Sequence, residues 1–130
     1  MRRLPLTAGA CLALGWLAQA VAAESVCRRL PDAEAWLARQ APSWRLSQYP
    51  GYVPPQGVRV CLVRSGSPRA QLASNRIDLR SAGGPDAATQ DRLSLVHEYL
   101  HLAFKQHPSG ADEPFIESLA RRLVLEVETP

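Results

Sequence analysis

His97, Glu98 and His101 lie in the segment LVHEYLHLAF, residues 95–104, with a spacing that suits metal chemistry. Residues four apart on a helix lie one above the other, so both imidazoles can reach one zinc ion at about 2.0–2.1 Å. Glu98 is rotated by about 100° from His97, so it can reach a metal-bound water without binding the ion. Zinc lowers the pKa of that water, the glutamate takes its proton, and the hydroxide attacks a carbonyl group.

A long helix must carry these three residues. Pro85 suits a helix start, and apolar residues then recur every three or four positions, which predicts a helix from about residue 85 to His107, where Pro108 follows. A second helix begins at Pro114 after a turn, and a shorter one covers residues 31–41. Residues 58–63 and 75–80 read as strands that could pair as a small antiparallel sheet. The expected class is α+β: a short antiparallel or mixed sheet packed on a long active-site helix, followed by a C-terminal helix.

The first residues resemble an export signal more than part of a domain. MRR supplies positive charge, an apolar run follows, and small residues gather at 20–23. We predict a signal peptide over residues 1–23, a single domain over 24–130, no membrane span after cleavage, and a periplasmic or secreted protein in a bacterium. Cleavage one residue earlier and an uncleaved anchor are the alternatives.

Charge and cysteine content narrow the function further. Without Arg2 and Arg3, 13 Lys and Arg residues face 12 Asp and Glu residues, so the mature domain gives no electrostatic reason to bind nucleic acid. Cys27 and Cys61 would remain as a pair in an oxidising compartment, which predicts a disulfide between them. Two buried thiols or a cysteine-containing zinc site are the alternatives, the second disfavoured because no CxxC spacing is present.

Two segments resemble known proteins. HEYLH is similar to the active-site helix of zincin metallopeptidases, and PFIESLA, residues 114–120, is similar to the glutamate-bearing helix start of gluzincins, with Ser118 where those enzymes often have glycine. The stretch from DRLSLVHEYLHLAF to ESLARRL also resembles an uncharacterised family of predicted secreted bacterial proteins. The zincin resemblance implies a small twisted sheet on the active-site helix and an edge strand that binds an extended peptide, for which residues 75–80 are the candidate.

The third metal ligand has four candidates. Glu117 is preferred, because it stands at the gluzincin glutamate and the last helix should fold back along the first. Its alternative is a surface ion pair with Arg121. His107 stands at the third histidine of the metzincin pattern HExxHxxGxxH, but Phe104 replaces the glycine of that pattern. Glu113 and Asp112 complete the set.

These observations support three hypotheses. The first is an exported peptidase with one Zn²⁺ per chain, with His97, His101 and Glu117 as ligands and Glu98 as the general base. The second is a non-catalytic zinc-binding module or adaptor of the cell envelope, which would work with a protein partner. The third is a structural domain without a metal. The carboxylate of Glu98 favours the enzyme, because a pure metal holder does not need it.

Overall fold

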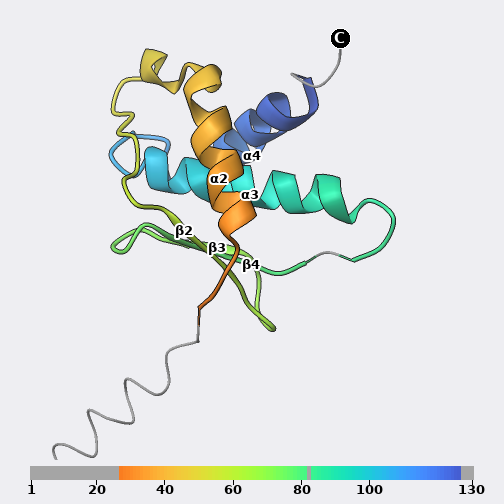
Figure 1. The fold of residues 1–130 in the computed structure, drawn as a ribbon. Helices are drawn as coiled ribbons and strands as arrows, with labels where there is room; N and C mark the ends of the chain where they lie inside the picture. Colours follow the sequence, from red (N-terminus) through yellow and green to blue (C-terminus); the bar gives the residue numbers. More distant parts are fainter. Residues whose placement is uncertain (1–26, 82, 127–130) are drawn as a thin grey trace, which may run out of the picture.

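The computed structural model describes residues 27–81 and 83–126, which form one sheet and a set of helices around a common core (Figure 1). The predicted signal peptide, residues 1–23, lies outside the described residues. None of the helices in the described part is both long and apolar enough to cross a bilayer. The strands and α-helices are β1 Arg28–Arg29, α2 Pro31–Gln40, β2 Arg59–Leu62, β3 Arg69–Gln71, β4 Arg76–Leu79, α3 Ala87–Ala103 and α4 Glu113–Arg121. Two 3-10 turns follow α2, at Ala41–Trp44 and Leu46–Gln48, and a π-helical turn, Arg122–Glu126, follows α4.

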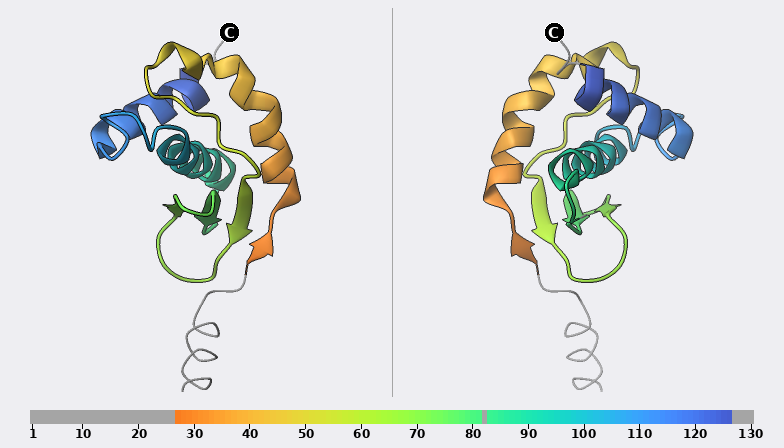
Figure 2. Two further views of the ribbon diagram at one scale, coloured as in Figure 1. Left: turned by 90° about the vertical axis from the view of Figure 1, so that its left-hand side faces the viewer. Right: turned by 90° about the vertical axis from the view of Figure 1, so that its right-hand side faces the viewer.

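The sheet is mixed, and its strands lie in the order β1-β2-β4-β3. β1 is antiparallel to β2, β2 is parallel to β4, and β3 is antiparallel to β4. One face of the sheet packs on α3, and α2 and α4 lie on opposite sides of that helix (Figure 2). Val60 and Ile77, which pair across β2 and β4, are fully buried. The expected α+β class with a mixed sheet is therefore confirmed.

The free edge of the sheet differs from the one predicted from the sequence. Residues 75–80 were expected to form a peptide-binding edge, but β4 is paired on both sides, so its backbone groups are already used. The free edge on this side is β3, a three-residue strand that the sequence did not reveal because Arg69, Ala70 and Gln71 have low strand propensity. Since β3 intervenes along the chain, β2 and β4 pair in parallel rather than antiparallel.

Helix α3 ends at Ala103, before the expected end at His107. Phe104 is fully buried, and the chain turns there: its carbonyl accepts the His107 N–H at 2.9 Å, while Ala103 O accepts the Val53 N–H at 3.0 Å. Burial of the Phe104 ring thus fixes the turn, although phenylalanine has no special preference for leaving a helix. The rings around it come from three segments: Tyr49, Tyr52, His107 and Phe115.

The predicted disulfide is confirmed. Cys27 and Cys61 are bonded, with their Cα atoms 5.1 Å apart, and the bond joins the start of the described chain to β2. The same corner is held by Glu34 of α2, whose carboxylate accepts the Val60 N–H at 2.9 Å and pairs with Arg29 at 2.6 Å. The first part of the chain is therefore tied to the sheet covalently and by hydrogen bonds.

Candidate metal centre

His97 and His101 lie one turn apart on α3, and their imidazoles point into the same space. Their Nε2 atoms are 3.3 Å apart. Two nitrogens bound to one tetrahedral zinc at about 2.0–2.1 Å are separated by about 3.3–3.4 Å, so the pair has the spacing of ligands on a single ion. Together with Glu98 they form a group whose ligand atoms all lie within 4.8 Å of one another. The predicted motif is therefore assembled in space.

Both histidine rings are oriented by hydrogen bonds through Nδ1. His101 Nδ1 lies 2.8 Å from the carbonyl oxygen of Gly110, and His97 Nδ1 lies 2.7 Å from Glu117 Oε2. A carbonyl and a carboxylate only accept, so Nδ1 carries the hydrogen in each ring and Nε2 of the neutral imidazole carries the lone pair. Such outer partners are common around metal-binding histidines, where they fix the tautomer and the ring plane.

Glu113, the first residue of α4, faces both lone pairs. Its Oε2 lies 2.8 Å from His97 Nε2, and its Oε1 lies 2.8 Å from His101 Nε2. When both imidazoles are neutral with Nδ1 protonated, the carboxylate and the two Nε2 atoms are all acceptors. A cation there would satisfy all three groups. Protonation of both rings would instead place two positive charges 3.3 Å apart.

Glu98 is buried beside this space, with 8% of its surface exposed. Burial raises the pKa of its carboxyl group, because the charged form loses hydration, and the nearby Glu113 acts in the same direction. His97, His101 and the backbone N–H of Ala70 on β3 oppose that rise. A buried carboxyl group with a raised pKa next to two candidate ligands has the properties of a general base.

The predicted site residues do not all lie at the candidate metal centre in the same way. The structure brings His97, Glu98 and His101 together. Glu117 reaches the group through Nδ1 of His97, the ring nitrogen that does not face His101, and its other oxygen accepts from Arg121 at 3.0 Å. Its assignment as a metal ligand stays a prediction, and Glu113 occupies the position that faces both Nε2 atoms.

The remaining two ligand candidates have structural roles. Asp112 is the N-cap of α4 and accepts the Phe115 N–H at 3.4 Å. His107 Nδ1 accepts the Ser109 N–H at 3.0 Å, and its ring stacks on Phe115 with the ring centres 5.4 Å apart. His107 therefore stabilises the turn between α3 and α4.

Sequence reasoning missed Gly110 and Ala70, which contribute only backbone groups. A Cβ on Gly110 would lie 2.0 Å from the carbonyl oxygen of Phe104, so no larger residue fits there without moving the turn. The SG dipeptide at this point signalled a turn, but nothing in the sequence links its carbonyl to His101.

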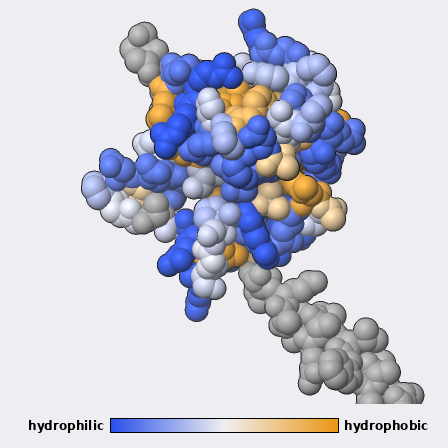
Figure 3. Space-filling view, turned by 180° about the vertical axis from the view of Figure 1, so that it is seen from behind, coloured by the Kyte–Doolittle hydropathy of each residue, from blue (hydrophilic) through white to orange (hydrophobic). Residues whose placement is uncertain are grey.

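A cleft of about 620 Å³ opens over the group, between α3, the β3 edge and the turn that leads to α4. Lys105, the only lysine of the chain, bridges one end of the cleft: its Nζ lies 3.3 Å from Leu72 O and 3.4 Å from Asn75 Oδ1. Leu72 is 45% exposed at the rim. The side of the molecule that carries α4 is otherwise mostly hydrophilic, with smaller apolar patches (Figure 3).

Comparison with known proteins identifies the family. The profile of the family described as "Predicted secreted protein (DUF2300)" matches residues 13–109. The chain belongs to the DUF2300 family. The expectation of an exported protein agrees with the family description, and the matched range of this chain contains His97, Glu98 and His101. Glu113 and Glu117 lie beyond the matched range.

The DUF2300 chain is also similar to "Uncharacterized protein YfaQ" of Escherichia coli (strain K12), with 43% identity over 107 residues. The match covers 81% of this chain and 19% of that protein, so the chain spans about a fifth of the length of its relative. No solved structure shows a significant match. Neither description specifies a reaction, so the metallopeptidase resemblance depends on the motif and on the geometry of the site.

Proposed function

We propose that this DUF2300 protein is an exported zinc-dependent peptidase. One observation carries the proposal: Nε2 of His97, Nε2 of His101 and the carboxylate of Glu113 lie within 2.8–3.3 Å of one another, all as acceptors when the rings are neutral. Two imidazoles and one carboxylate are a common ligand set for catalytic zinc, which keeps a fourth position for water.

His97, His101 and Glu113 would hold the ion, with Glu117 in the role of a positioning residue. Its contact with His97 Nδ1 suits a group that orients a ligand, and Gly110 does the same for His101. Glu113 and Glu117 are four residues apart and so share one face of α4, which explains how one helix can supply both groups. This assignment replaces the preference for Glu117 that the sequence suggested.

Bound zinc would polarise a carbonyl group and lower the pKa of a coordinated water. Glu98 would accept the proton of that water and pass it to the leaving amine nitrogen, so its carboxyl group is restored after each cycle. The burial that raises the pKa of Glu98 supports both transfers, because a carboxyl group that binds its proton more tightly can serve as base and then as acid.

An extended peptide would bind along β3. This strand is the free edge beside the cleft, and the Ala70 N–H on that edge already faces Glu98. Backbone pairing there would bring a peptide carbonyl next to the proposed water and would require little sequence specificity. The peptide site thus moves from residues 75–80, as expected from the sequence, to Arg69–Gln71.

The second candidate is a zinc-binding module without catalytic activity. It is supported by the comparison with the longer Escherichia coli protein, of which this chain covers only a small part. A domain that spans 19% of a longer relative can serve as a binding unit of that protein. Glu98 favours the enzyme, because the ligand set is complete without this buried carboxylate.

Metal analysis and turnover together test the proposal. Protein purified without added metal should contain about one zinc per chain by atomic spectroscopy and should cleave a mixture of internally quenched peptides. Glu98→Gln should retain the zinc and lose at least about 100-fold in rate, whereas Glu126→Gln, at an exposed carboxylate, should leave both unchanged. Absence of zinc even after reconstitution would refute the metal site, and zinc without hydrolysis would favour the binding module.

A further inference from the structure

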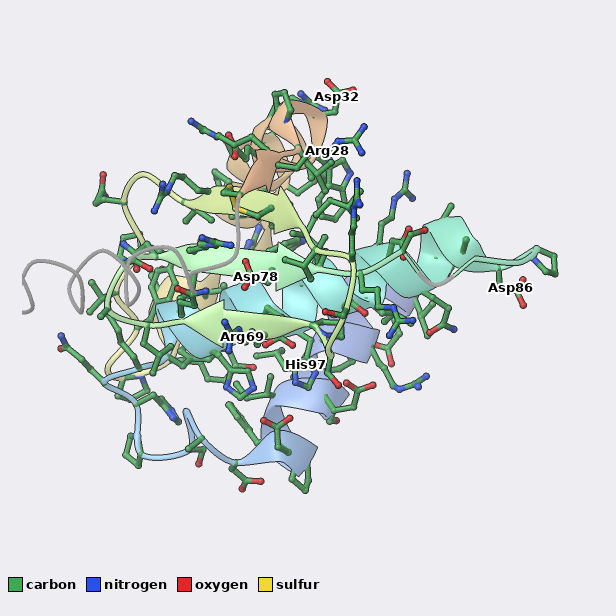
Figure 4. The ribbon with its side chains drawn as sticks, turned by 90° about the horizontal axis from the view of Figure 1, so that it is seen from below. Arg28, Asp32, Arg69, Asp78, Asp86 and His97 are labelled. Carbon is green, nitrogen blue, oxygen red and sulfur yellow. A yellow bond between two sulfur atoms is a disulfide. The ribbon has the colours of Figure 1, made fainter. Side chains whose placement is uncertain are left out.

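The outer face of the sheet, opposite α3, contains a second hollow of about 660 Å³. Arg69 and Asp78 lie on this face, and His97 lies beyond the β3 edge (Figure 4). The polar and charged side chains that line it are Arg28, Arg64, Ser65, Ser67, Arg69 and Asp78. The hollow is therefore formed by β1, the loop between β2 and β3, and the middle of the sheet.

The only acidic group in this lining is already neutralised. The Asp78 side chain is 3% exposed, and its carboxylate accepts from Arg76 Nε at 2.7 Å, from Gln71 Nε2 at 3.0 Å and from Arg69 Nε at 3.3 Å. Its capacity to compensate further cations is consequently small. Three arginines against one carboxylate leave the lining with a net positive charge of two.

Arg28 and Arg64 supply the unmatched charge. Both are exposed, and neither has an acidic partner among the described residues. The neighbouring Arg29 differs, because Glu34 pairs with it at 2.6 Å. Two guanidinium groups on one hollow, each without an anion, are the donor counterpart of the acceptor cluster at the candidate metal centre.

The backbone that carries these donors is fixed. Arg28 follows Cys27, which is bonded to Cys61 of β2, and Arg28 itself pairs with Leu62. On the loop, Gly66 has a φ of +87°, which allows the tight turn that brings Ser65 and Ser67 to the hollow. Binding an anion would therefore require ordering of side chains but little rearrangement of the backbone.

We propose that this hollow binds a phosphate group of a small anionic ligand. The guanidinium fork of arginine matches phosphate oxygens with paired hydrogen bonds, and serine hydroxyls add further donors. Phosphate offers more acceptor oxygens than a carboxylate and can use arginines from both sides of the hollow together with the hydroxyls between them. A volume of about 660 Å³ falls within the range of small-molecule sites, so the ligand is larger than the phosphate group itself.

Calorimetric titration with pyrophosphate at constant ionic strength tests this site in the full mature chain. Wild type should bind one pyrophosphate on this face, and Arg28→Gln combined with Arg64→Gln should weaken that binding at least tenfold. Arg39→Gln removes an exposed arginine of α2 and should have no effect. Any pyrophosphate taken up at the metal centre is common to all three proteins, because none of these substitutions touches His97 or His101.

Three outcomes would overturn the proposal. These are no saturable binding, equal weakening by Arg39→Gln, and binding of malonate as tight as that of pyrophosphate, which would indicate a general effect of positive charge. Circular dichroism and zinc content that match wild type would show that the double variant is folded. If it is not folded, Arg64→Gln alone, in an exposed loop away from the disulfide, gives the decisive comparison.

Discussion

The two sides of this small sheet gather opposite kinds of hydrogen-bonding groups. On the α3 side, two histidines and Glu113 bring acceptors together with no donor between them, whereas on the outer side Arg28 and Arg64 bring donors together with no acceptor. In the first group the two histidine side chains are half-buried and held by contacts at 2.7–2.8 Å, although Glu113 is exposed; in the second group both arginines are exposed. Close contacts among acceptors favour a cation between them, while an exposed cluster of like charge is hydrated and indicates only a preference for anions.

The largest effect should come from the acceptor side. Glu113→Ala should weaken zinc binding by on the order of 1,000-fold, since a free energy of about 10–16 kcal/mol is divided among three or four ligands. Glu117→Ala should weaken it by only about 10- to 100-fold, as expected for an orienting partner. Zinc titrations against a competing chelator measure both, with His107→Ala as the control that changes little. The reverse order would return the ligand role to Glu117.

Removal of the disulfide should affect stability more than the metal site. Cys27→Ala with Cys61→Ala should lower the free energy of unfolding by about 3–4 kcal/mol, because the bond closes a loop with a sequence separation of 34. Zinc affinity of the folded fraction should stay within a few-fold, since the bond lies on the outer side. Urea denaturation monitored by circular dichroism measures the first quantity. A zinc affinity that falls in parallel with stability would show that the two sides are not independent.

Gly110→Ala should lower the free energy of unfolding by a smaller amount. The added Cβ would overlap the Phe104 carbonyl, which should cost about 1–3 kcal/mol and move the carbonyl that orients His101. Thermal unfolding with and without zinc measures this effect, and zinc should stabilise the variant less than wild type. Gly57→Ala is the comparison: a Cβ there would meet nothing within 4 Å, and only its positive φ of +61°, which Gly110 does not share, should be unfavourable. Equal behaviour of the two variants would contradict the role of the turn.

The smallest effect concerns Glu34, which gives Arg29 the acidic partner that Arg28 lacks. The hydrogen bond from Arg29 lowers the pKa of Glu34, with a further contribution from the Val60 N–H. A lowered folded-state pKa means that the stabilisation is present above the unfolded-state pKa and is lost as pH falls through the folded value. Glu34→Ala should therefore cost about 1 kcal/mol at pH 7 and less in acid. Melting temperatures from pH 3 to pH 7 test this, and a constant difference across that range would exclude the ionised pair as the cause.

The sequence predicted the parts that depend on local patterns. The helical spacing of His97 and His101, the strands at residues 58–63 and 75–80, and the pairing of Cys27 with Cys61 follow from periodicity, propensity and the number of cysteines. The role of β3 did not follow, because a three-residue edge strand is defined by its partner rather than by its own residues.

The sequence also could not decide whether Glu113 or Glu117 is the better candidate for the third metal ligand. Both lie on one face of α4, and which of them faces the histidine Nε2 atoms depends on the level at which α4 meets α3. That level is set by the turn at Phe104 and Gly110, where a buried ring and a close backbone contact determine the path of the chain.

The aromatic rings around Phe104 extend the support of His101 far along the chain. Tyr49 packs on Phe104 and Phe115, and a Cβ on Gly51 would lie 2.9 Å from the carbonyl of Gln106, so the loop at residues 49–52 presses directly on the turn that contains Gly110. Substitutions in that loop should therefore alter zinc affinity without touching any ligand. The metal would then act as a reporter of packing at a segment that a sequence comparison of the motif alone would treat as an unrelated linker.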